Sequence, residues 1–238
     1  MDVPRIRLSW DEYALIQRHR NDEGSRVLVI GDLHAPFTKE GYIDHCSTIS
    51  DKYKCNKIVF IGDLIDNHYS SYHETDPDGH SAREELESAI RHIRLWEERF
   101  PEAVVCLGNH DRIPDRKAMT AGLSSRWIKS VGEVLETKQW KYDTEWTIDD
   151  VKYIHGEGRK AKFRAKDDMI NVVQGHYHSE GYIKFFVGEN YKIFACQVGC
   201  GIDRQAYAMA YGRHFAKPHL SCGVVINGTL PILEYMEL

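Results

Sequence analysis

The chain contains 238 residues, of which 42% are apolar and 28% are charged, enough for one globular domain or at most two small ones. Asp and Glu (36) outnumber Lys and Arg (31), and the net charge of −5 excludes a general attraction to nucleic acid or anionic membranes. No apolar run approaches the roughly 18 residues of a membrane helix, and no signal-peptide pattern begins the chain. Six scattered Cys residues form no Cys-x-x-Cys pair, which favours free thiols and a cytoplasmic protein.

The first half of the chain predicts strands that alternate with helices. A helical arm is expected over residues 1–25, with Ser9 in the position of a helix cap, ahead of a main domain at 26–238. Apolar runs predict buried strands at 26–30, 57–61 and 103–107. Helices are predicted at 39–54 and 81–99, the second capped by Ser81. This βαβαβ pattern predicts a functional site beyond the carboxyl ends of the strands.

The second half predicts a helix and then mostly strands. The helix is expected over 118–134, with Trp127 and Ile128 in the core, and a hairpin is expected over 139–150. Further strands are predicted at 151–154, 171–174, 191–198 and 223–226. The chain from 182 onward is expected to add antiparallel strands, with Asn227-Gly228 forming a tight hairpin turn.

Polar side chains that can bind metals follow five of the predicted strands. They are Asp32, His34, Asp63, Asn109, His155, His176 and His178. Two carboxylates, four imidazoles and one amide suit two divalent first-row metal ions. A carboxylate shared between two ions holds them roughly 3.5–4 Å apart, as two-metal hydrolases require. The positive charge left after ligation would favour a phosphate ligand and lower the pKa of a bridging water.

The same residues lie in five short blocks that occur in a fixed order. These are GDLH at 31–34, GDLID at 62–66, GNHD at 108–111, IHGE at 154–157 and GHYH at 175–178. Over about residues 26–180 the blocks resemble the calcineurin-like metallophosphoesterase superfamily, and segment 199–213 is loosely similar to members from tailed phages. The resemblance implies an α/β fold in which two β-sheets form a sandwich flanked by helices, with a dimetal site at the strand carboxyl ends.

The resemblance also implies a role for each block residue. Asp32, His34, Asp63 and His178 would hold one ion, and Asp63, Asn109, His155 and His176 the other. A water between the ions would attack the phosphorus, and His110 would bind phosphate and protonate the leaving oxygen as general acid. Asp66 would complete the catalytic pair by orienting His110. Mn²⁺ is the expected ion, with Fe, Zn, Co or Ni as alternatives.

Two features of the sequence narrow the substrate class. The second block lacks the Arg that protein phosphatases and dinucleoside-tetraphosphate hydrolases of this superfamily carry there, which disfavours both activities. Five of the eight residues from 159 to 166 are basic, and with Arg112, Arg116 and Lys117 they predict a basic rim for DNA or RNA. A solvated helix face is the alternative. The expected substrate contacts are Asn109, His110, Arg112, Arg159, Lys160 and Lys162.

We therefore expect a phosphodiesterase acting on nucleic acid, that is, a nuclease. A small-molecule phosphodiesterase, for cyclic nucleotides or similar esters, and a phosphomonoesterase are the alternatives. A non-catalytic scaffold of this fold is disfavoured, because His110 and all seven metal ligands are present. The oligomeric state is left open.

Several nearby residues receive a structural interpretation. The loop histidines His68, His73 and His80 are expected in solvent, with substrate contact as the alternative. Asp111 is expected either to support the ligands or to cap a helix. The cysteines are expected to be small buried apolar side chains.

Overall fold

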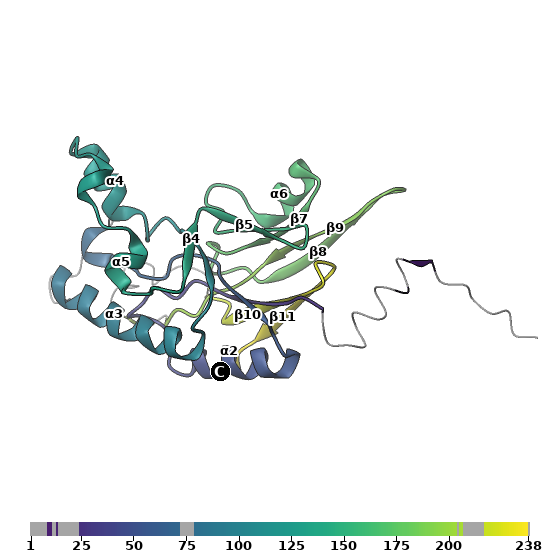
Figure 1. Cartoon of the computed structure of the whole chain (residues 1–238), viewed down its shortest axis with the longest axis horizontal. Helices are drawn as coiled ribbons and strands as arrows, with labels where there is room; N and C mark the ends of the chain where they lie inside the picture. Colours follow the sequence, from purple (N-terminus) through teal and green to yellow (C-terminus); the bar gives the residue numbers. More distant parts are fainter. Residues whose placement is uncertain are drawn as a thin grey trace, which may run out of the picture.

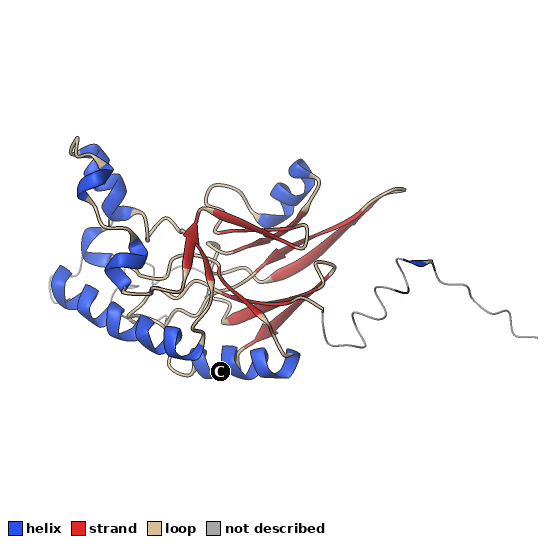
Figure 2. Ribbon diagram, in the orientation of Figure 1, coloured by secondary structure: helices blue, strands red, loops and turns tan. Residues whose placement is uncertain are grey.

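Two β-sheets lie face to face and helices cover their outer surfaces (Figures 1 and 2). The computed structural model describes residues 9–10, 13, 24–71, 79–203, 205–206 and 217–237. The predicted α/β sandwich is therefore confirmed. Most of the predicted arm at 1–25 lies outside the described residues, as do His73 and most of 204–216.

Within the described residues, the first sheet has six strands. In spatial order they are β11 (Leu230–Tyr235), β10 (Ser221–Ile226), β1 (Arg26–Ile30), β2 (Lys57–Phe60), β3 (Val104–Cys106) and β4 (Lys141–Asp143). The neighbours from β1 to β4 are parallel, and β10 pairs antiparallel with both β1 and β11. Asn227 and Gly228 both have positive φ angles in the β10–β11 turn, which confirms the predicted hairpin.

The second sheet has five strands within the same described ranges. In spatial order they are β5 (Glu145–Ile148), β6 (Val151–Ile154), β7 (Asn171–Gln174), β9 (Lys192–Gln197) and β8 (Tyr182–Val187). Strands β6, β7 and β9 are parallel, so their carboxyl ends share one edge. The antiparallel pairs are β5 with β6 and β8 with β9.

Helices connect the strands and cover the sheets. They are α2 (Tyr42–Tyr53), η1 (His68–Ser70), α3 (Ala82–Arg99), α4 (Ile113–Thr120), η2 (Ser125–Trp127), α5 (Val131–Leu135) and α6 (Ala161–Asp168). Helices α2 and α3 pack on the first sheet, and α6 packs on the second. The predicted cap of α3 is confirmed, because the Ser81 hydroxyl accepts from the Glu84 amide and the Glu84 carboxylate accepts from the Ser81 amide.

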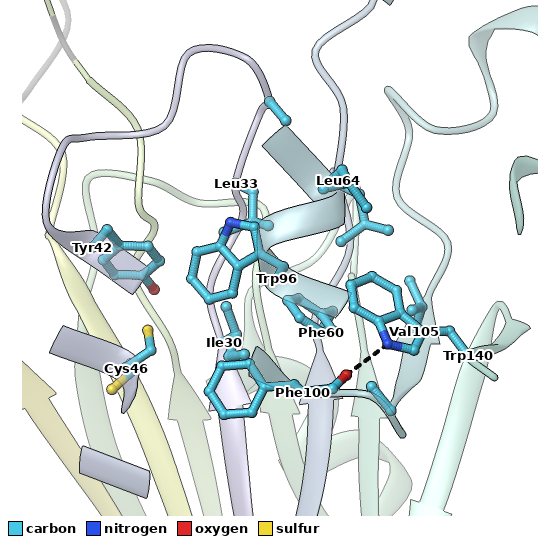
Figure 3. Packing of buried hydrophobic residues seen from close by; sticks show 14 of the residues in the cluster. Ile30, Leu33, Tyr42, Cys46, Phe60, Leu64, Trp96, Phe100, Val105 and Trp140 are labelled. Carbon is cyan, nitrogen blue, oxygen red and sulfur yellow. Dashed lines mark hydrogen bonds between the residues drawn. The ribbon is translucent and has the colours of Figure 1, made fainter. Parts of the chain in front are cut away.

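The alternation of side chains along β1 divides the core into layers. Leu28 and Ile30 face the helices, whereas Val27 and Val29 face the second sheet. Trp96 of α3 lies at the centre of the helix-facing layer (Figure 3). All six cysteines are free, as predicted, and five of them are buried. No helix among the described residues is long and apolar enough to cross a membrane.

The predicted helix over 118–134 is wrong. The chain forms α4, η2 and α5 instead, because Gly122 takes a φ of +72° and the Leu123 amide then donates to the Ala118 carbonyl. Trp127 is 82% exposed and Ile128 is only half-buried, so the expected core positions are also wrong.

The predicted hairpin over 139–150 is also wrong. Strand β4 pairs with β3 in the first sheet, whereas β5 pairs with β6 in the second. The segment therefore passes from one sheet to the other, and a period-two pattern alone does not distinguish this crossing from a hairpin.

Burial of Trp96 predicts a large effect of its removal. Trp96→Ala should lower the free energy of unfolding by about 3–5 kcal/mol, because the side chain is 1% exposed and its loss leaves a cavity. Trp127→Ala is the matched control and should change the free energy of unfolding by less than about 0.5 kcal/mol, because this side chain is exposed. Urea titration of both variants measures the difference, and equal effects would contradict the layer assignment.

Candidate metal centre

The candidate ligands meet where the carboxyl ends of both sheets come together. Asp32 and His34 follow β1, Asp63 follows β2 and Asn109 follows β3, whereas the remaining three follow β6 and β7. The structure places their side chains in two groups of donors that share Asp63. These are Asp32, His34, Asp63 and His178, and Asp63, His155 and His176. All six side chains in these groups were identified from the sequence.

The donor atoms of the first group all lie within 4.8 Å of one another. His178 Nε2 lies 3.0 Å from Asp32 Oδ2, and His34 Nε2 lies 3.5 Å from Asp63 Oδ2. The two imidazole nitrogens, His34 Nε2 and His178 Nε2, are 3.3 Å apart. Three of the four side chains are buried, so water is largely excluded from the charged atoms.

The second group is arranged around His155. Its Nε2 lies 3.1 Å from Asp63 Oδ2, 3.2 Å from His176 Nδ1 and 3.0 Å from Asn109 Oδ1. The Asn109 amide oxygen therefore joins the donors of this group, as the sequence predicts. Asp63 Oδ2 lies close to imidazoles of both groups, so this carboxylate would be shared if each group held an ion.

The outer contacts of two imidazoles show that this donor set fits cations. His34 Nδ1 lies 2.5 Å from Asp66 Oδ1, and His155 Nδ1 lies 3.1 Å from the Ile61 carbonyl oxygen. Each Nδ1 carries the hydrogen that these acceptors require, so in the neutral ring the Nε2 lone pair points into the centre. Converging lone pairs and carboxylate oxygens repel one another unless a proton or a metal ion lies between them. Imidazole and carboxylate donors suit the divalent first-row ions.

Charge coupling within the centre is strong. Burial lowers the pKa of His155, but the carboxylates of Asp63 and Asp32 outweigh it and raise that pKa to about 9. The pKa of His34 is likewise raised, because hydrogen bonds and charges from Asp63 and Asp66 outweigh the lowering by burial. Burial raises the pKa of Asp63, but the charges of His155 and His110 outweigh it and hold that pKa well below its ordinary value.

Three candidate ligands have a backbone conformation that L-residues rarely adopt. The φ angles of His34, Asp63 and His176 are +48°, +46° and +72°. Gly62 has a φ of +114°, and a Cβ there would lie 2.6 Å from the His155 ring. Such conformations persist where surrounding contacts determine them, and they gather at functional sites.

Asp111 supports the ligand loops and caps no helix. Its buried carboxylate accepts from the Gly108 amide at 2.9 Å and from the Ile65 amide at 3.3 Å. Burial, together with the charge of Asp63, raises the pKa of Asp111 to about 6. Of the two interpretations left open by the sequence, the structure therefore shows support of the loops after β2 and β3.

His110 lies beside the first donor group. Its Nδ1 is 2.5 Å from the Asp66 main-chain oxygen and 3.6 Å from the Asp66 carboxylate, and its amide donates to Asp63 Oδ1 at 2.8 Å. The Asp66 carboxylate makes its short contact with His34 instead. Asp66 thus contacts His110 through its carbonyl and a candidate metal ligand through its carboxylate.

The expectation of a solvated His68 is wrong. The side chain is buried, with Nδ1 4.0 Å from Asp66 Oδ2, and the main-chain amide donates to Glu85 at 2.7 Å. Glu85 was missed because a carboxylate within a helix is ordinarily solvated. Asn67 was also missed, and its Nδ2 donates to the His110 carbonyl at 2.9 Å. His80 is exposed, as expected.

Two buried glutamines brace the second-sheet loops, and sequence reasoning missed both. Gln174 Nε2 donates to the carbonyls of Gly156 and Arg159, and Gln197 Nε2 donates to the carbonyls of Gln174 and Gly175. Each glutamine is the last residue of an otherwise largely apolar strand, and this placement is the signal that could have identified them.

Ion pairs with nearby carboxylates neutralise at least three of the eight cations that form the predicted basic rim. Arg112 pairs with Glu157, Arg159 with Asp167, and Lys160 with Glu180. The ammonium of Lys162 lies 5.2 Å from the ring centre of Phe163 and 5.9 Å from that of Tyr182. The positive charge available for a polyanion along α6 is therefore smaller than the sequence suggests.

Comparison with known proteins places these residues in a family context. Residues 25–200, which include the whole donor set, match the family model described as calcineurin-like phosphoesterase. No curated protein sequence matches the chain.

Solved structures of similar shape include three proteins from different organisms. An archaeal phosphodiesterase is 14% identical, with 89% of this chain and 99% of the other covered and a TM-score of 0.45. Vacuolar protein sorting 29 from Cryptosporidium parvum is 12% identical, with coverages of 90% and 92% and a TM-score of 0.47. The nuclease MPE from Pseudomonas putida is 11% identical, with coverages of 87% and 86% and a TM-score of 0.43.

The raised pKa of His155 predicts proton-linked metal uptake. Below about pH 9 the His155 imidazole of the empty centre holds a proton, which an incoming metal ion must displace. The affinity for the metal ion should therefore fall as the pH falls. Each displaced proton should change the apparent Mn²⁺ affinity by about tenfold per pH unit. Calorimetric titration of EDTA-stripped protein at pH 6, 7 and 8, in two buffers of different ionisation enthalpy, measures both affinity and proton release. A pH-independent affinity would contradict the protonated empty site.

Proposed function

The chain belongs to the calcineurin-like phosphoesterase family, and from that premise we propose that it is a phosphodiesterase acting on nucleic acid. The observation that carries the proposal is the pair of buried donor groups sharing Asp63, with His110 beside them. Metal-dependent phosphoester hydrolysis is the chemistry of the family. What we propose beyond the family is that the substrate is a phosphodiester and that it belongs to a nucleic acid.

The charge around the centre favours a diester over a monoester. A phosphodiester carries one negative charge near neutral pH, whereas a monoester carries nearly two. Arg112, which follows the third sequence block, is paired with Glu157, and Asn67 stands where related protein phosphatases carry an Arg. With these guanidinium charges neutralised or missing, the centre is better matched to the singly charged ester.

Each proposed ligand has a defined contact in the centre. Asp32, His34, Asp63 and His178 would hold one ion, and Asp63, Asn109, His155 and His176 the other. When bound, two divalent ions neutralise phosphate charge and supply a water-derived nucleophile. Mn²⁺ is the proposed ion, and Fe, Zn, Co and Ni have the same ligand preferences.

His110 is the proposed general acid. Its Nδ1 faces the Asp66 carbonyl, which accepts its hydrogen and orients the ring, so Nε2 is the nitrogen available to deliver a proton. Asp66 then acts as a positioning residue that fixes His110 and His34 together. The leaving oxygen takes the proton from Nε2 as its bond to phosphorus breaks.

A small-molecule phosphodiesterase is the second candidate. The ion pairs of Arg159 and Lys160 favour it, because they remove two of the positive charges that would bind a polyanion beside α6. Comparing nucleic-acid and small-ester substrates distinguishes the two candidates.

The proposal predicts hydrolysis of a simple diester. With Mn²⁺, bis-p-nitrophenyl phosphate should be hydrolysed with a higher kcat/KM than p-nitrophenyl phosphate. Asp63→Ala should abolish turnover, because both donor groups lose their shared carboxylate. Asp44→Ala, which removes an exposed carboxylate, is the matched control and should retain activity. Preference for the monoester would refute the diester assignment, and full activity of Asp63→Ala would refute the site.

The role of His110 predicts a dependence on the leaving group. His110→Ala should lower kcat about 10²–10⁴-fold for an alkyl leaving group, which needs protonation, and much less for p-nitrophenolate, which does not. Comparing a methyl and a p-nitrophenyl ester of the same nucleotide tests this. An equal loss for both esters would show that His110 binds phosphate and does not transfer the proton.

A further inference from the structure

A basic segment follows the third sequence block, although the chain as a whole is acidic. Residues 112–130 contain five Lys and Arg residues and one Asp, in a protein of net charge −5. The segment forms α4 and η2, and α4 projects away from the two sheets (Figure 1). The charges are Arg112, Arg116, Lys117, Arg126, Lys129 and Asp115, and Arg112 among them is paired with Glu157.

The same segment exposes large apolar side chains that the core does not use. Trp127 is 82% exposed, Met119 is 75% exposed and Leu123 is 52% exposed. The face of α4 that packs against the protein consists of the buried Ile113 and Ala118, so the exposed side chains are not part of that packing. The chain reverses at Gly122 and η2 packs against α4, so the exposed side chains belong to one small projecting unit.

Charge and aromatic surface occur together at Trp127. Arg126 precedes it, Lys129 follows two residues later, and both side chains are exposed. Arg126 forms no salt bridge with any residue that the structure describes, in contrast to the paired Arg159 and Lys160 near α6. An exposed indole between cations matches single-stranded nucleic acid, whose bases stack on aromatic rings and whose phosphates bind cations.

We propose that Trp127, with Arg126 and Lys129, forms a stacking platform for a single-stranded nucleic acid that extends into the metal centre. This inference rests on the proposed function and names the substrate class of the same site. It also replaces α6 with the 112–130 segment as the main nucleic-acid surface.

The segment that carries the platform begins at the metal centre. Helix α4 begins three residues after His110, and the Arg112 Nε donates to the Gly108 carbonyl at 3.1 Å, which ties the start of the segment to the ligand loop. Eight helical residues span about 12 Å, which is the length of about three to four stacked nucleotides. A single strand that runs along α4 from Trp127 would therefore reach the reacting phosphate within a few nucleotides.

Two other occupants fit the surface less well. A second copy of this chain, docked about a twofold axis, would bring like positive charges together. Duplex DNA keeps its bases paired, so its stack offers Trp127 no unpaired base.

The test is binding of a fluorescein-labelled dT12 oligonucleotide by the full chain in EDTA, followed by fluorescence anisotropy. Base stacking is worth about 1–3 kcal/mol, so Trp127→Ala should weaken binding roughly fivefold to 150-fold. Trp127→Phe should retain most of the affinity, because a phenyl ring also stacks. Trp10→Ala removes another exposed Trp, 84% exposed, and should bind as the wild type does. An unchanged unfolding midpoint would show that Trp127→Ala remains folded.

The cations give an independent readout. Replacing Arg126 and Lys129 together by Gln should reduce the slope of log affinity against log salt by about 0.7 for each charge removed. The matched variant, Arg159→Gln with Lys160→Gln, should change the slope less, because those cations are already paired.

Each contrary result has a distinct meaning. Wild-type affinity in Trp127→Ala, or tighter binding of duplex than of single strand, would overturn the platform. A concentration-dependent dimer that dissociates in Trp127→Ala would assign the surface to self-association and also overturn it. Because binding is measured in EDTA, a failure here is separable from failure of the metal-dependent diester hydrolysis.

Discussion

A buried carboxylate surrounded by imidazoles is the constraint on which the rest of the site depends. Asp63 is 1% exposed, and an unpaired charge at that depth would be costly. His34 and His155 approach it from opposite donor groups, and the His110 amide donates to its other oxygen. Protons on the imidazoles or metal ions between the donors can balance the negative charge. The centre is therefore poised to exchange protons for cations.

The double-sheet architecture provides the precision that this arrangement requires. Ligands separated by well over a hundred positions, such as Asp32 and His178, come within 3.0 Å of each other because two sets of parallel strands end at a common edge. The side chains of Asp111, Gln174 and Gln197 brace the ligand loops by hydrogen bonds to main-chain groups: the carboxylate accepts and the two amides donate. The backbone at the positive-φ ligands is held by other contacts: the His34 amide donates to the Asp63 carbonyl at 2.9 Å, and the His176 amide donates to Asp32 Oδ2 at 2.8 Å.

The sequence predicts the ligand loops well because their signals are local. An apolar strand followed by Gly and Asp or His specifies both the element and the position of its polar residue, as at Asp32 and Asp63. Other features depend on distant partners. The pairing of Lys160 with Glu180 and the burial of His68 beside Asp66 leave no local trace. At Trp127, helical periodicity was misleading because Gly122 and the serine caps at 124 and 130 interrupt the helix.

The most direct test of the account is anomalous diffraction from crystals grown with Mn²⁺. Two peaks per chain are expected, roughly 3.5–4 Å apart, with the Asp63 carboxylate between them. His34 and His178 should contact one peak and His155 and His176 the other. A single peak, or two peaks that do not share Asp63, would contradict the central claim that this carboxylate organises a two-metal phosphoesterase site.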